Sequence, residues 1–173
     1  MVSAQDYLIT IAQIAIAIAG FSSIVEALST RHMNHWTDEE RYKFRLLLQV
    51  SAVAMFFALL PMILVQVLEE SIAWRVSLLI YGVVHLMDIG SFIIKLPAGV
   101  PSFVKATIAV GLTIVFSQLF IAITNQSSLM IFIYLVALAW QIFIAFLGFA
   151  MLLYGVRPKT AENREKDSLD AKP

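Results

Sequence analysis

Long apolar segments, separated by short polar ones, constrain this chain more than any other feature of its sequence. The hydrocarbon core of a bilayer is about 30 Å thick, and an α-helix needs about 20 apolar residues to cross it. In lipid, a helix satisfies its backbone N–H and C=O groups internally, whereas an isolated strand does not. The sequence therefore predicts an all-α, polytopic transmembrane helical bundle. Five spans are expected, at residues 7–28, 46–68, 72–94, 103–124 and 129–154.

The composition agrees with a membrane protein. Of the 173 residues, 60% are hydrophobic and 14% are charged, whereas soluble proteins average about 45–50% and about 25%. A soluble domain of this size has too little interior to bury such a surplus. Acidic and basic residues balance at 12 each, so the lipid bilayer is the expected partner and a nucleic acid is not. The chain has no cysteine, which excludes disulfides and thiolate chemistry.

The distribution of lysine and arginine predicts the orientation, because basic residues concentrate in cytoplasmic loops. With the N-terminus outside and the C-terminus inside, Arg75 is the one basic residue of the 12 that falls outside. We expect a membrane domain over residues 1–156 and a polar cytoplasmic tail over 157–173. An alternative has four spans, with the first segment lying in or re-entering the membrane. The basic residues placed inside are Arg31, Arg41, Lys43, Arg45, Lys95, Lys105, Arg157, Lys159, Arg164, Lys166 and Lys172.

The second span is expected to begin as a cytoplasmic helix. Thr37, followed three residues later by Glu40, matches a capping box, so the helix should start near Asp38. Pro61 lies inside the apolar segment and should kink it. Basic side chains near the expected membrane surface can contact anionic lipid headgroups. These are Arg31, Arg41, Lys43 and Arg45.

The third span contains an unusual set of ionisable side chains, in the stretch YGVVHLMDIGSFIIK at residues 81–95. At 100° per residue, six polar side chains fall within about 120° of one helix face. An ionised side chain near the bilayer centre costs at least about 2.5–3.5 kcal/mol, so this face must contact protein or water. We call it the polar stripe. It consists of Ser77, Tyr81, His85, Asp88, Ser91 and Lys95.

The polar stripe has three interpretations. Its side chains can form hydrogen bonds between helices, each worth about 0.6 kcal/mol. It can instead handle protons or ions, with Asp88 as the titrating group and His85 tuning it. The spacing of three residues allows these two side chains to form a direct hydrogen bond. A metal or haem role for His85 needs an axial partner from elsewhere, so no metal or cofactor is expected.

The first span has a face of small residues that favours close helix packing. A carboxylate, Glu26, lies at its inner end, where it is a candidate charge partner for Lys95 or Arg31 and could reach Asp88. Whether this seam meets a helix of the same chain or of a second protomer stays open at this point. The seam consists of Leu8, Ala12, Ala15, Ala19, Ser22 and Glu26.

Other polar residues in the membrane are candidates for lining a hydrated path or for packing hydrogen bonds. These are Thr107 and Gln118 in the fourth span and Gln141 in the fifth. His32 and His35 lack a third ligand nearby, so we interpret them as part of a polar loop and not as a metal site. The sequence has no catalytic motif, and we expect no enzymatic activity.

The segment IAQIAIAIAGFSSIVEAL, residues 11–28, resembles the first helix of small bacterial integral membrane proteins with the pattern IAxIxxAxAGFxxIVxAL. The resemblance implies a multi-pass helical bundle in a bacterial inner membrane. It carries over no activity and no site.

Two functions follow from these features. The first is a small, self-associating integral membrane protein that encloses a polar, proton- or ion-conducting path lined by the third span. The second is an accessory, sensory or assembly subunit of a larger membrane complex, with the first loop or the tail as the docking element. An intramembrane enzyme or a haem or metal protein is a third interpretation.

Overall fold

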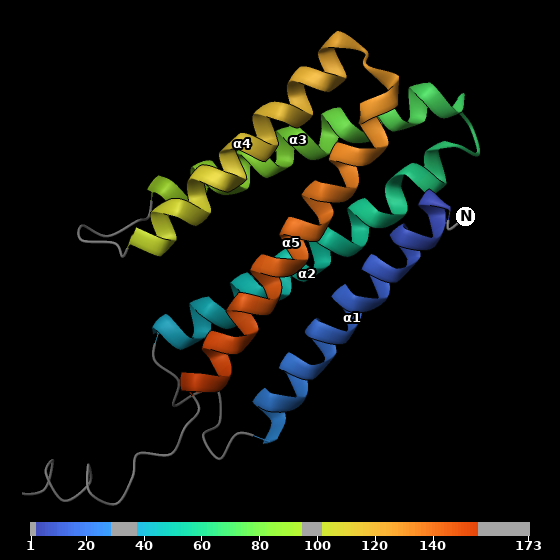
Figure 1. The fold of residues 1–173 in the computed structure, drawn as a ribbon. Helices are drawn as coiled ribbons and strands as arrows, with labels where there is room; N and C mark the ends of the chain where they lie inside the picture. The colour runs from blue at the N-terminus through green and yellow to red at the C-terminus, as the bar shows by residue number, and fades with distance from the viewer. Residues whose placement is uncertain (1–2, 29–37, 95–101, 156–173) are drawn as a thin grey trace, which may run out of the picture.

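The computed structural model describes residues 3–28, 38–94 and 102–155, although some side chains within these ranges, that of Glu26 among them, are not described. This part of the chain is all helical and contains no strand, which confirms the predicted fold class (Figure 1). All five helices are long and apolar enough to cross a membrane. The orientation stays a prediction. The helices are α1 (Ala4–Leu28), α2 (Asp38–Leu64), α3 (Glu70–Ile94), α4 (Ser102–Thr124) and α5 (Ser127–Gly155).

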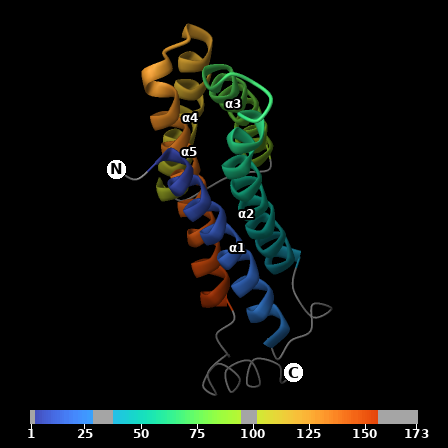
Figure 2. The same ribbon diagram turned by 90° about the vertical axis from the view of Figure 1, so that its right-hand side faces the viewer.

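The helices form two groups. Helix α1 packs mainly on α2 and also on α5, whereas α3 and α4 pack together as a hairpin. Figure 1 shows this hairpin running at an angle to α1, α2 and α5, so that its far end lies apart from theirs, and Figure 2 agrees. Helix α5 contacts each of the other four helices and connects the two groups.

The hydrophobic core follows the same division. The larger cluster contains buried residues of all five helices. The smaller cluster comes from α1, α2 and α5 alone. In the larger cluster, each helix contributes at least one buried residue, such as Leu8 from α1, Phe57 from α2, Tyr81 from α3, Ile114 from α4 and Tyr134 from α5. The buried residues of the smaller cluster are Ile18, Phe44, Leu47 and Ala145.

The small-residue seam of α1 packs within the chain. Leu8, Ala12, Ala15 and Ser22 are buried, and the Ser22 hydroxyl donates to the Ile18 carbonyl at 2.6 Å. Because α1 packs on α2 and α5, these residues are already covered and do not form a free association surface. The seam therefore no longer supports self-association, and the oligomeric state stays a prediction.

Local backbone features define the start of α1 and the end of α4. At the start of α1, the Ser3 hydroxyl accepts from the Asp6 backbone N–H at 3.2 Å, and the Asp6 carboxylate accepts from the Ser3 N–H at 2.8 Å. This reciprocal pair is a capping box that the sequence analysis did not identify. At the end of α4, Asn125 has a left-handed backbone (φ 56°), which asparagine tolerates better than most residues.

Arg75, the exception to the predicted charge distribution, has a structural role at this same end. Its Nε–H donates to the Ala122 carbonyl, at 2.9 Å, in the last turn of α4. A cation at a helix C-terminus interacts favourably with the helix dipole and with carbonyls that lack a helical donor. Arg75 is thus used to connect α3 with the end of α4.

Pro61 lies in the last turn of α2, which ends at Leu64, before the predicted end at Leu68. A proline has no N–H, so it cannot donate to the carbonyl four residues earlier, that of Phe57. The hydroxyl of the buried Tyr134, on α5, donates to this carbonyl at 2.5 Å. The proline therefore frees an acceptor that a tyrosine of another helix uses.

Candidate functional site

The polar stripe of α3 changes its surroundings along the helix. Ser77 and Tyr81 are 0% exposed and His85 is 4% exposed. Asp88 is half-buried, and Ser91 is exposed. Lys95 lies outside the described residues. The stripe is thus enclosed by the protein in the first part of α3 and opens toward the end of the helix.

His85 is held between two side chains. Its Nδ1 lies 3.3 Å from Oε1 of the buried Gln118 on α4. Its ring stacks on Tyr81, with centroids 5.5 Å apart and planes at 9°. Because an amide oxygen only accepts, this contact places the proton of neutral His85 on Nδ1 and leaves a lone pair on Nε2. The structure therefore brings Gln118, a predicted lining residue, to the polar stripe.

Glycines allow α4 to come this close to α3. A Cβ at Gly82 would lie 2.9 Å from Cδ2 of Leu119, and one at Gly111 would lie 3.1 Å from Cδ1 of Ile89. Both distances are shorter than ordinary van der Waals contacts. Small residues permit such close helix approach in membranes. Gly82 lies beside Gln118 on the facing helix, so its lack of a side chain supports the contact with His85.

Asp88 has its partner on α2. The amide Nε2 of Gln49 donates to Oδ1 of Asp88 at 3.3 Å. The sequence analysis did not single out Gln49, although an amide within an apolar segment, at a depth similar to that of Asp88, could have indicated it. The predicted direct bond between His85 and Asp88 is replaced by contacts to other helices. The predicted pairings of Glu26 fall on side chains outside the described residues.

Four buried aromatic side chains extend from Tyr81, which stacks on His85, toward the start of α3. Phe57 stacks on Tyr81 at 4.5 Å, Tyr81 meets Tyr134 edge-on at 5.5 Å, and Trp74 meets Tyr134 at 5.6 Å. The Tyr81 hydroxyl donates to the Ala137 carbonyl at 3.1 Å. We call Phe57, Trp74, Tyr81 and Tyr134 the aromatic layer. It joins α2, α3 and α5 and closes the enclosed end of the polar stripe.

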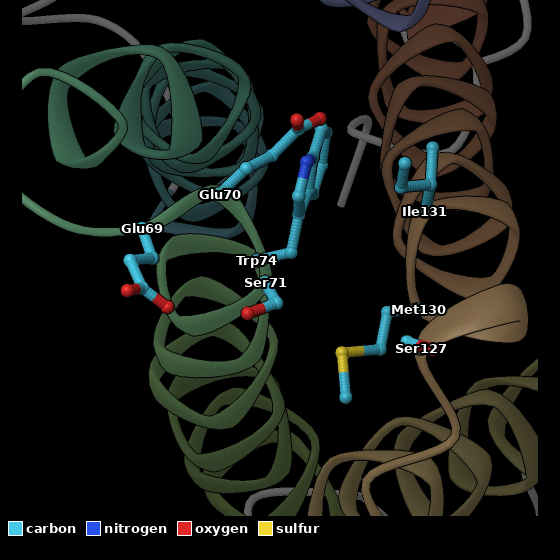
Figure 3. A pocket seen from close by; sticks show the side chains of 7 residues that line it. All are labelled: Glu69, Glu70, Ser71, Trp74, Ser127, Met130 and Ile131. Atoms are coloured by element: carbon cyan, nitrogen blue, oxygen red, sulfur yellow. The ribbon is translucent and has the colours of Figure 1, made fainter.

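A cavity of about 420 Å³ lies on the other side of the aromatic layer. Figure 3 shows the carboxylate of Glu70 and the indole of Trp74 on the same side of α3, toward α5, whereas Glu69 points away. Trp74 belongs to both the cavity and the aromatic layer, so ring contacts lead from this cavity through Tyr134 and Tyr81 to His85. The lining residues are Glu69, Glu70, Ser71, Trp74, Ser127, Met130 and Ile131.

Three buried polar atoms of the described residues have no hydrogen-bond partner. They are Oγ of Ser51, Oγ of Ser77 and Nε2 of Gln118. Several other hydroxyls in the helices donate to carbonyls of their own helix, as that of Thr107 does to Phe103 at 2.9 Å. The donor of the Thr107 hydroxyl is therefore satisfied within α4, and its role in lining a path stays a prediction. The same kind of bond, to the carbonyl four residues earlier, is formed by the hydroxyls of Ser22, Ser23, Thr113, Ser117 and Thr124.

No contact of the remaining candidate residues with His85 or Asp88 is seen in the described part of the chain. Gln141 is buried in α5 at 5% exposure. Arg41 and Arg45 are exposed near the start of α2. Arg31, His32 and His35, and the side chain of Lys43, are outside the described part of the chain. Within that part, no three His, Asp or Glu side chains are gathered as metal ligands would be.

Comparisons with protein-family models, with curated proteins and with solved structures find no match for this chain. The bacterial setting implied by the first helix therefore stays a prediction, and the argument for function depends on the site itself.

Proposed function

We propose that this chain is a small, non-enzymatic integral membrane protein that handles protons or small cations on the polar stripe of α3. The observation that carries the proposal is the pair of polar contacts on this helix. His85 is held by Gln118 deep in the bundle, and Asp88 is held by Gln49 one turn closer to the open end. Ionisable groups inside a membrane protein are expensive to keep and usually mark ion or proton pathways.

The graded burial of the stripe supports a pathway more than simple packing. A hydrogen bond between helices needs no titratable group, and an amide on each side would serve. Here a carboxylate is half-buried and an imidazole lies behind it, in the order that a proton or cation entering from the open end would meet them. In the predicted orientation, this end faces the cytoplasm.

The aromatic layer is the proposed barrier. It lies between His85 and the cavity near Glu70, so polar surfaces lie on both sides of a closed section made mainly of aromatic side chains. The stripe faces other helices of its own chain, as the partners on α2 and α4 indicate. These contacts support a path within one protomer, which would not require self-association.

Flux measurements in liposomes test the proposal. The wild-type protein should carry protons or small cations, and Asp88→Asn should lower the flux because the amide has no titratable group. Met87→Ala is the control, since Met87 is 66% exposed on the same helix and lies outside the polar stripe, and its flux should equal that of the wild type. Equal flux for wild type and Asp88→Asn contradicts the proposal. Absence of flux, together with a copurifying protein, favours the accessory-subunit alternative.

A further inference from the structure

Two buried polar atoms of the site remain unexplained by the contacts within the chain. Nε2 of Gln118 and Oγ of Ser77 have no partner, and both side chains are 0% exposed. Buried polar groups are nearly always hydrogen-bonded, either to protein or to ordered water. Their position is informative, because Gln118 holds His85 and Ser77 lies on α3 between Trp74 and Tyr81 of the aromatic layer.

The chemistry of these atoms selects the ligand. The Gln118 amide nitrogen has two N–H donors, and its oxygen already accepts from His85. The ligand must therefore offer an acceptor to the amide. A serine hydroxyl both donates and accepts. Water meets these requirements, since it donates and accepts and typically forms two to four hydrogen bonds at buried sites.

A metal cation fits this site poorly. Cations such as Ca²⁺ and Mg²⁺ need several oxygen ligands. At His85, the Gln118 oxygen is engaged and the nearby N–H groups present hydrogens, which repel a cation. A proton needs no such set of ligands, because it moves along hydrogen-bonded groups and water.

We propose that water occupies buried sites at Gln118 Nε2 and Ser77 Oγ, and that the species carried on the polar stripe is a proton and not a metal cation. The second part rests on the proposed function, whereas the water sites do not. A hydronium ion on the Asp88 side of His85 transfers one proton to Nε2, breaking one O–H bond and forming one N–H bond. The imidazolium still donates its Nδ1–H to Gln118, and it returns to neutral when Nε2 transfers its proton to a water on the Ser77 side.

The titratable groups around His85 are few in the described part of the chain. Tyr81 stacks on its ring, and Asp88 follows one turn later on α3. The contact from α4 is the neutral Gln118, and the contact from α2 to Asp88 is the neutral Gln49. From α5, Tyr134 packs on Tyr81. No cation among these groups opposes protonation of His85, and Asp88 is the nearby group that can exchange a proton.

The first experiment detects the water itself. Solid-state NMR of the wild-type protein in bilayers should show magnetisation transfer from water to the side-chain amide of Gln118, with the signal assigned by its loss in Gln118→Met. Because the measurement uses wild-type protein, it does not depend on how well a variant folds. A Gln118 amide signal without transfer from water overturns the water site at this residue.

The second experiment identifies the species carried. In liposomes, proton flux should persist when Na⁺ and K⁺ are replaced by a bulky organic cation, and Ser77→Ala should lower it by about tenfold or more. Ser23→Ala is the matched control, because the Ser23 hydroxyl already donates to the Ala19 carbonyl, and its flux should be unchanged. Flux of Na⁺ or K⁺ without proton flux overturns the proton assignment but leaves the proposed function. Absence of any flux overturns both, whereas the NMR result still decides on the water.

Discussion

The two ends of α3 have different surroundings. Trp74, Leu78 and Tyr81 lie in a core to which all five helices contribute. In this part of α3, the side chains of Arg75 and Tyr81 form hydrogen bonds to α4 and α5. From His85 onward, α3 contributes no buried residue to that core. It contributes none to the smaller cluster either, which comes from α1, α2 and α5 alone. Figure 1 shows the α3–α4 hairpin diverging from α1, α2 and α5 toward that end of α3. His85 and Asp88 therefore lie where the five-helix core ends, at the border between the closed half of α3 and its open half.

The largest expected effect comes from removing a member of the aromatic layer. Tyr81→Ala should lower the free energy of unfolding by about 3–5 kcal/mol, as large-to-small changes at buried aromatic positions do. Met87→Ala, on the same helix but 66% exposed, is the control and should change it little. Reversible unfolding in mixed micelles measures both. Similar losses for the two variants would mean that the two faces of α3 are packed alike.

A smaller loss of stability is expected from changes to Tyr134, whose hydroxyl donates to the carbonyl that Pro61 leaves without a helical donor. Tyr134→Phe leaves the Phe57 carbonyl without a donor, which should cost about 1–3 kcal/mol. In a Pro61→Ala background, the new Ala N–H can donate to that carbonyl, so the same tyrosine change should cost less. A double-mutant cycle measures this coupling. Additive losses would show that the tyrosine hydroxyl does not replace the missing proline donor.

The next largest loss of stability is expected at the close contact between α3 and α4. Gly82→Ala places a methyl group 2.9 Å from Leu119, and such overpacking costs about 1–3 kcal/mol. The low end is expected because the Leu119 side chain can move. Gly90→Ala is the control, since a Cβ there meets nothing within 4 Å. Thermal unfolding of the two variants gives the comparison, and a loss confined to Gly90→Ala would contradict this packing.

The smallest effect on stability is expected at the contact between Gln49 and Asp88. Gln49→Leu removes one bond to a half-buried carboxylate, and bonds of this kind in membranes average about 0.6 kcal/mol. Proton flux should change more than stability, because Asp88 loses the group that orients it. A large loss of stability with unchanged flux would indicate that the Gln49–Asp88 contact serves packing alone.

The fold was largely predictable from the sequence, and the site was predictable in part. The apolar segments indicate each helix because the bilayer fixes both the length of a span and its backbone structure. Helical spacing identified the polar stripe as one face, and Ser77, Tyr81 and His85 do share a buried side. The partner Gln49 was missed, because contacts between α2 and α3 depend on how helices are rotated, which an apolar segment does not specify. The contact of Gln118 with His85 depends on the close approach at Gly82 in the same way.

The five long apolar helices in the described part of the chain follow from the amino-acid sequence, because lipid leaves an apolar backbone of this length almost no alternative. Which polar groups meet depends on how the helices pack. The tertiary structure covers the small-residue seam of α1 within the chain, gives Tyr134 the acceptor freed by Pro61, and places Gln118 against His85. The physical reason is that most of a transmembrane helix is apolar on every side, so its hydrophobicity fixes its length and leaves its rotation to the packing of particular side chains.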